Sequence, residues 1–225
     1  MSRTSLRNVA PGAMVALVAV LVYAASACSP RAGALAPSEP EEFRGLFAHA
    51  EGASTLLPCG AGADGGTVEA VPITATPALL AAYARATRQG YPGQRIEVAF
   101  RGTRDPETGR VVVRDHSAAV AKTRHSACLP AELWALGNEP YWSLQVSRAE
   151  GVAEWSAIGE QTVPYAYAAP TVEEGGAVRR YYFRGQQRLK VTVTEEACED
   201  TMAGNRYPYR VRVERAGRVY EGCGQ

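Results

Sequence analysis

The chain has 225 residues, 24 of them basic and 23 acidic, so its formal net charge is +1 at pH 7. Proteins that bind nucleic acid neutralise many phosphates with a basic face, and this balance argues against that class of function. Hydrophobic residues make up 46% of the chain, which is typical of a globular protein.

Residues 1–27 have the layout of a bacterial secretion signal. Arg3 and Arg7 stand there without an acidic residue, an uncharged apolar run follows at 13–25, and small residues precede Cys28. The apolar run is too short for a hydrocarbon core that takes about 20 residues of helix to cross. We therefore expect 1–27 to be a cleaved signal peptide. Without its two arginines, 22 basic and 23 acidic residues leave a net charge of −1.

The tetrad Ala25-Ser26-Ala27-Cys28 resembles the lipobox of bacterial lipoproteins, in which the cysteine is acylated and becomes the new N-terminus. Lipoboxes usually have Leu or Val where Ala25 stands, and the tetrad also suits the ordinary signal peptidase, which would leave Cys28 unmodified. The resemblance implies lipidation at Cys28 and a membrane-anchored protein of the cell envelope that faces the periplasm. Ser29 after the cysteine favours the outer membrane in a cell with two membranes.

The segment 28–41 is rich in Ser, Pro, Ala and Gly, and it predicts a flexible tether that holds the folded part away from the membrane. Beyond it, four cysteines form an even set, as expected where disulfides persist, and they allow three pairings. We expect the pairs Cys59–Cys128 and Cys198–Cys223, because each then lies within one of two predicted domains, 42–130 and 131–225. None of the four stands in a CxxC motif or beside a histidine at zinc spacing, so we expect no metal.

The first domain, 42–130, is predicted to be a small β-barrel with one helix. Thr76 is a natural N-cap for a helix that starts at Pro77 and is closed by Gly90. The alternation of Ile96, Val98 and Phe100 with charged residues predicts a strand with one buried face. The strands are expected at 43–48, 54–58, 67–73, 96–101 and 111–114.

Four features of this domain carry a family resemblance: Leu57-Pro58-Cys59, the helix at 78–83, the strand at 96–102 and the closing Cys128. They resemble the oligonucleotide/oligosaccharide-binding (OB) type barrel of envelope lipoproteins in the NlpE and META-domain group. The resemblance implies an OB-like fold. Copper-associated members have Leu-Pro-Cys-x-x-Cys, and Gly62 stands where their second cysteine would be. We therefore do not expect their thiolate chemistry here.

The second domain, 131–225, is predicted to be a small antiparallel β-barrel or sandwich. Strands are expected at 144–146, 155–158, 189–194, 207–213 and 219–220, with a turn at Ala216-Gly217. Its motifs at 135–142, 198–209 and 220–223 resemble an uncharacterised family of bacterial envelope proteins. That resemblance implies a small β domain in the envelope and no established activity.

The first motif supplies candidate binding residues: Asn138, Glu139, Tyr141 and Trp142. Gly137 permits close backbone approach, and the two aromatic rings offer flat apolar faces to a ligand. In the alternative interpretation, Trp142 fills the core while Asn138 and Glu139 hold loop backbone.

The second motif supplies Asn205, Arg206 and Tyr207. The segment 203–207 resembles the Ser-Gly-x-x-Tyr loop of periplasmic lysozyme inhibitors, with Ala203 in place of Ser. Arginines alternate with apolar residues near the C-terminus, which is typical of a solvated strand face, with an anionic envelope ligand as the alternative. They are Arg206, Arg210, Arg212, Arg215 and Arg218.

No catalytic constellation is evident in the sequence. A hydrolase triad needs a nucleophile, a base and a group that orients the base, but the three histidines are scattered and Gly-x-Ser-x-Gly is absent. The acidic group Glu195, Glu196, Glu199 and Asp200 is typical of a solvated loop. We expect no enzyme, metal or cofactor, but a binding or sensing module whose partner is an envelope protein, a glycan or a small ligand. The alternative is an inhibitor of a muramidase-type hydrolase.

Overall fold

The computed structural model describes residues 39–60, 68–123, 126, 128, 131–173, 175–200 and 202–225. The predicted signal peptide, Cys28 and most of the predicted tether lie outside these residues, as do Gly62 and His125. Within the described ranges, no helix is long and apolar enough to cross a membrane. The structure is mainly β, as predicted, and its strands form a five-stranded closed barrel and a nine-stranded sheet.

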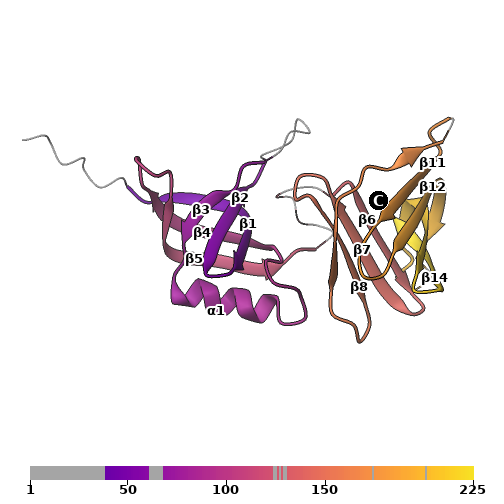
Figure 1. Ribbon diagram of the computed structural model, residues 1–225, viewed down its shortest axis with the longest axis horizontal. Helices are drawn as coiled ribbons and strands as arrows, with labels where there is room; N and C mark the ends of the chain where they lie inside the picture. The colour runs from indigo at the N-terminus through magenta and orange to yellow at the C-terminus, as the bar shows by residue number, and fades with distance from the viewer. Residues whose placement is uncertain are drawn as a thin grey trace, which may run out of the picture. The chain divides into compact units, whose positions relative to one another are not determined.

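The barrel has the strand order β1-β2-β3-β5-β4, closed by pairing of β4 with β1 (Figure 1). All neighbours are antiparallel except β3 and β5. The single helix of the described barrel residues, α1, comes between β3 and β4. This arrangement confirms the predicted OB-like barrel. The elements are β1 (Glu41–Ala50), β2 (Ala53–Pro58), β3 (Val71–Thr74), α1 (Pro77–Ala86), β4 (Ile96–Arg104) and β5 (Val111–Ala121).

The start of α1 follows the prediction and its end does not. The Thr76 hydroxyl accepts a hydrogen bond from the Leu79 backbone N–H at 3.2 Å, which caps the helix, and Pro77 fits the first turn. The helix ends at Ala86 rather than near Gly90, because the Thr87 N–H and hydroxyl both bond to the Tyr83 carbonyl and close the last turn. Leu79 and Tyr83 turn inward and join the barrel core with Ile96, Val98 and Phe100 of β4.

The nine-stranded sheet has the order β10-β11-β12-β13-β14-β6-β7-β8-β9, with every neighbouring pair antiparallel. Its strands are β6 (Leu133–Asn138), β7 (Tyr141–Ser147), β8 (Val152–Ala157), β9 (Val163–Ala166), β10 (Thr171–Val172), β11 (Val178–Phe183), β12 (Leu189–Glu199), β13 (Arg206–Arg215) and β14 (Arg218–Gly224). The predicted turn at Ala216-Gly217 joins β13 to β14, and both residues have positive φ, as a two-residue hairpin requires.

The sheet curls so that its two halves enclose one core (Figure 1). Side chains of β7 and β8 meet those of β11 to β14, and Trp142 stacks on Trp155 with ring centroids 5.3 Å apart. Tyr220 of β14 packs edge-on against Trp155 at 4.9 Å. Aromatic packing of this kind contributes beyond area burial alone, so these rings anchor the middle of the sheet.

The barrel and the nine-stranded sheet, which we call the first and second β units, contain one disulfide each. Cys59 after β2 is bonded to Cys128, with 4.4 Å between the Cα atoms, and Cys198 of β12 is bonded to Cys223 of β14, with 5.5 Å between them. These are the two pairings expected from the sequence. The second bond ties the end of the β12–β13 hairpin to the last strand.

Candidate binding site

The two sequence motifs of the second β unit lie next to each other. The side-chain amide of Asn138, at the end of β6, donates a hydrogen bond to Oδ1 of Asp200, just after β12. The Cys198–Cys223 disulfide lies beside them, and its neighbours in the same small apolar cluster are Tyr207 and Leu136. Residues far apart in the sequence are therefore joined at one end of the sheet.

Asp200 shapes the loop that carries the second motif. Its Oδ1 also accepts hydrogen bonds from the backbone N–H groups of Met202 at 2.9 Å and Ala203 at 3.4 Å. Its own N–H donates to the Asn205 carbonyl at 2.9 Å. A side-chain oxygen that bonds backbone two residues ahead fixes a tight turn. Asp200 is buried, so the prediction of a solvated acidic loop is wrong for this residue.

Two glycines allow the strands around this point to approach closely. A Cβ on Gly137 would collide with the Trp142 indole, and one on Gly222 would collide with the Leu136 carbonyl. Neither position has room for a Cβ, so glycine at 137 and 222 lets β6, β7 and β14 converge.

A hollow of about 210 Å³, which we call the motif pocket, opens over this convergence. Its walls come from the ends of β6, β12 and β14. The lining residues are Leu136, Gly137, Asn138, Glu139, Cys198, Glu199, Asp200, Arg210, Glu221, Gly222 and Cys223.

The motif pocket is surrounded by an excess of negative charge. Three of the nearby carboxylates have arginine partners: Glu199 lies 3.5 Å from Arg206, Glu196 lies 3.0 Å from Arg210, and Glu221 lies 3.1 Å from Arg212. Glu139 and Asp200 have no cationic partner among the residues that the structure describes. The described lining has four carboxylates and one arginine, Arg210, and an excess of one sign of charge in a cleft raises the local concentration of ligands of the opposite sign. The motif pocket therefore favours a cationic group.

The predicted binding residues divide into buried and exposed ones. Trp142 is 1% exposed and donates a hydrogen bond from its indole N–H to the Glu221 carbonyl at 3.3 Å, so it belongs to the core. Tyr207 is 6% exposed and also faces inward. Neither ring presents a surface to a ligand, which favours the core interpretation of Trp142 and corrects the expectation for Tyr207.

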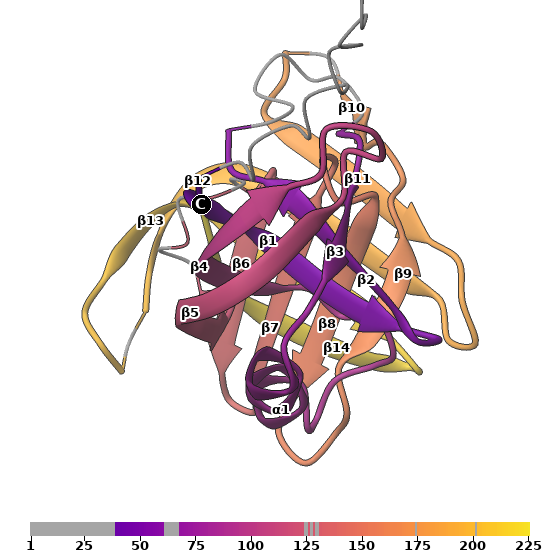
Figure 2. The ribbon, with the colours of Figure 1, turned by 90° about the vertical axis from the view of Figure 1, so that its left-hand side faces the viewer.

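The remaining candidates are accessible. Tyr141 is 51% exposed, and Glu139 and Asn205 are exposed as well. The Arg206 side chain is 85% exposed at the start of β13. Figure 2 shows the β12–β13 hairpin projecting from the side of the sheet.

The histidines of the described chain do not assemble into a site. His49 lies in β1 and its Nδ1 is 2.9 Å from the Ser54 hydroxyl, whereas His116 lies on β5. Among the residues that the structure describes, no three His, Cys, Asp or Glu side chains are grouped as metal ligands would be.

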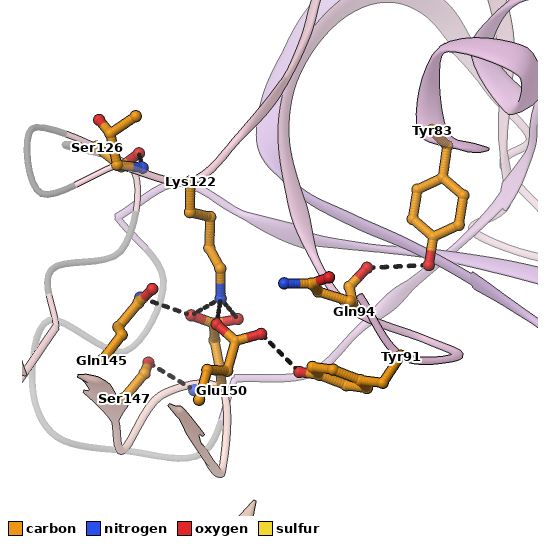
Figure 3. A network of polar contacts seen from close by, with 10 residues as sticks. Tyr83, Tyr91, Gln94, Lys122, Ser126, Gln145, Ser147 and Glu150 are labelled. Carbon is orange, nitrogen blue, oxygen red and sulfur yellow. Dashed lines mark hydrogen bonds and ion pairs between the residues drawn. The ribbon is translucent and has the colours of Figure 1, made fainter. Parts of the chain in front are cut away.

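A second polar cluster, which we call the charged network, was not predicted. It is formed by Lys122, Glu150, Glu154 and Tyr91. Figure 3 shows Lys122, Glu150 and Tyr91 close together. Lys122 follows β5, and its Nζ lies 2.8 Å from Glu150 Oε2 and 2.6 Å from Glu154 Oε2. The three charged side chains are at most 7% exposed. The Tyr91 hydroxyl donates to Glu154 Oε1 at 2.7 Å. The bonded partners are 28 to 63 residues apart in the sequence. Because sequence periodicity reports only on near neighbours, it did not reveal the network.

Two side chains at the edge of the charged network, Tyr91 and Arg95, have shifted pKa values. Burial raises the pKa of Tyr91 strongly, and the negative charge of Glu154 raises it further. Burial lowers the pKa of Arg95, and the negative charge of Glu150 offsets only part of this lowering. The Arg95 Nη1 atom is buried without a hydrogen-bond acceptor among the described residues.

Tyr91 makes the stability of the fold sensitive to alkaline pH. Its folded-state pKa lies above the unfolded value of about 10, so its contribution is intact below that pH and is lost as the pH rises past it. We expect the free energy of unfolding to fall more gently above pH about 10 in Tyr91→Phe than in the parent chain. Urea denaturation across this range measures both slopes. Identical slopes would show that Tyr91 titrates alike in both states.

Three comparisons with known proteins gave no match: no family model, no curated protein and no solved structure matches this chain.

Proposed function

We propose that this protein is a non-enzymatic cell-envelope lipoprotein that binds a partner through the motif pocket. The observation that carries the proposal is the convergence of both sequence motifs on one hollow with two carboxylates, Glu139 and Asp200, that lack a cationic partner among the described residues. A partner that brings a lysine or arginine side chain, or an amine, complements this charge.

The polar groups of the motif pocket hold its backbone in one conformation. Asp200 uses one carboxylate oxygen to hold Asn138 and two backbone N–H groups. The Cys198–Cys223 disulfide fixes the wall behind it. A preorganised surface loses little conformational freedom on association, which favours binding.

The two disulfides also support export of the protein to the cell envelope. Disulfides persist in oxidising compartments and are rare in the cytosol. Two disulfides, together with a leader that ends in small residues before Cys28, fit a protein secreted and then anchored by its first mature residue. Acylation of Cys28 would also account for the fifth thiol.

A photo-crosslinking experiment in intact cells tests the binding proposal. A diazirine amino acid replaces Glu199, which lines the motif pocket and is exposed, and a matched control carries it at Glu107, which is exposed in the turn between β4 and β5. We expect a discrete adduct from position 199 that is absent from position 107 and is reduced by Asp200→Asn. The same adducts at both positions, or none at 199, would contradict the proposal.

Inhibition of a muramidase-type hydrolase is the second candidate function. It is favoured by Arg206 and Asn205, which are exposed on the projecting β12–β13 hairpin. Stoichiometric addition of the protein to a muramidase would then abolish lysis, and Arg206→Ala would weaken the inhibition at least tenfold, the effect of about 1.4 kcal/mol. Undiminished lysis at excess protein would eliminate this function.

A further inference from the structure

One end of the nine-stranded sheet carries a row of four side chains on its outer face. The strand register aligns Tyr182 of β11 with Lys190 of β12, Lys190 with Glu214 of β13, and Glu214 with Val219 of β14. Residues directly opposite each other in antiparallel strands point to the same face. Tyr182 is 53% exposed and Val219 is 48% exposed, so an aromatic and an aliphatic side chain stand in solvent at the two ends of this row.

Three arginines border this row. Arg184 and Arg188 lie in the turn between β11 and β12, and Arg218 begins β14. All three are exposed. They line two adjoining hollows, of about 720 and 430 Å³, that share Arg188 and Lys190. We call the row and these arginines together the basic edge.

The charge of the basic edge is not balanced as it is elsewhere on the same strands. Further along the sheet, Arg180 pairs with Glu173 at 2.7 Å, Arg210 with Glu196 at 3.0 Å, and Arg212 with Glu221 at 3.1 Å. At the basic edge the one acidic member is Glu214.

Glu214 lies 3.2 Å from Lys190. Arg184, Arg188 and Arg218 have no carboxylate partner among the described residues. The basic edge therefore has four cations and one anion, and this excess creates a positive electrostatic potential that attracts anionic ligands.

We propose that the basic edge docks on the anionic phospholipid headgroups of a membrane. Exposed arginines are attracted to phosphate esters, and each basic residue near an anionic surface strengthens binding about fivefold. Tyrosine and valine side chains at the same edge fit the boundary between headgroups and acyl chains. The choice of a membrane as occupant rests on the proposed anchoring at Cys28, which would keep the folded part close to a lipid surface.

Vesicle binding by the full chain tests this proposal. Co-sedimentation is measured with vesicles of pure phosphatidylcholine and with vesicles that contain phosphatidylglycerol, and the ratio of the two affinities gives the anionic preference. The test variant is Arg184→Gln/Arg188→Gln/Arg218→Gln. The matched control, Arg104→Gln/Arg148→Gln/Arg180→Gln, removes the same charge at ion-paired positions outside the basic edge.

We expect the test variant to lose about a hundredfold of the anionic preference, and the control to lose far less. High salt should remove the preference of the parent chain, because surface charges are then screened. Equal losses in both variants, or a preference that survives in the test variant, would overturn the proposal.

Release of the parent chain by inorganic phosphate at constant ionic strength would also overturn it, since the basic edge would then be a site for a free anion. All three proteins carry the same N-terminal segment, so failure of acylation at Cys28 would leave these ratios unchanged. The proposed anchoring and the docking can therefore fail separately.

Discussion

Replacing Lys122 by methionine is expected to lower the free energy of unfolding by about 3–5 kcal/mol. The variant leaves the carboxylates of Glu150 and Glu154 buried near each other without the ammonium that lies 2.8 and 2.6 Å from them. Removing one partner from a buried ion cluster is costly because the remaining charges stay desolvated. Urea denaturation at neutral pH measures the loss.

Two further variants control the Lys122 experiment. Lys190→Met breaks a partly exposed pair with Glu214 and should cost less than about 1 kcal/mol. The triple variant Lys122→Met/Glu150→Gln/Glu154→Gln removes the uncompensated charges and should recover much of the lost stability. If Lys122→Met costs no more than Lys190→Met, the charged network is not a buried ion cluster in solution.

Trp142→Ala is expected to destabilise the protein by about 3–5 kcal/mol, the range for removing a large aromatic side chain from a core. The side chain is fully enclosed and stacks on Trp155. Its removal leaves a cavity in the middle of the nine-stranded sheet and strips the Glu221 carbonyl of a hydrogen-bond donor. Thermal or urea unfolding, monitored by circular dichroism, measures this loss of stability.

The neighbouring Tyr141 provides the matched control for Trp142. It is half exposed, so Tyr141→Ala should change stability by no more than about 0.5 kcal/mol. Comparable effects of the two substitutions would contradict the placement of Trp142 in the core. The pair also separates packing from binding, because Tyr141 can contact a partner without supporting the fold.

The sequence predicted those parts of the fold that depend on local patterns. Alternation of Ile96, Val98 and Phe100 marked β4, and Thr76 with Pro77 marked the start of α1. Both signals reflect which side chains one element buries or which backbone groups it caps, and these are set within a few residues. Cysteine parity, with the expectation of one bond in each domain, gave the two disulfides.

The sequence could not predict contacts that depend on distant segments. Four strands of the sheet were not predicted: β6, β9, β10 and β11. β9 and β10 have only four and two residues, and β6 and β11 do not alternate apolar with polar side chains, so none of them carries a clear period of two. Asp200 stands in an acidic run that is typical of solvent, and only its contact with Asn138, 62 residues away, shows that it is buried. The charged network around Lys122 was missed for the same reason.

These findings also explain how the proposed binding site is supported. The exposed members of the motif pocket lie on backbone that buried neighbours hold in place: Trp142 beneath Gly137, and Asp200 within its own loop. Function would therefore depend on the core residues indirectly. A substitution in the core should impair binding through loss of fold, whereas one at Glu139 should impair binding alone.

The intact mass of the protein extracted from membranes, recorded with and without reduction, tests the central claim that this is an exported and anchored binding module. We predict a chain that starts at Cys28, carries acyl groups on that residue, and gains the mass of four hydrogens on reduction as two disulfides open. A chain that retains its leader and five free thiols would contradict the account.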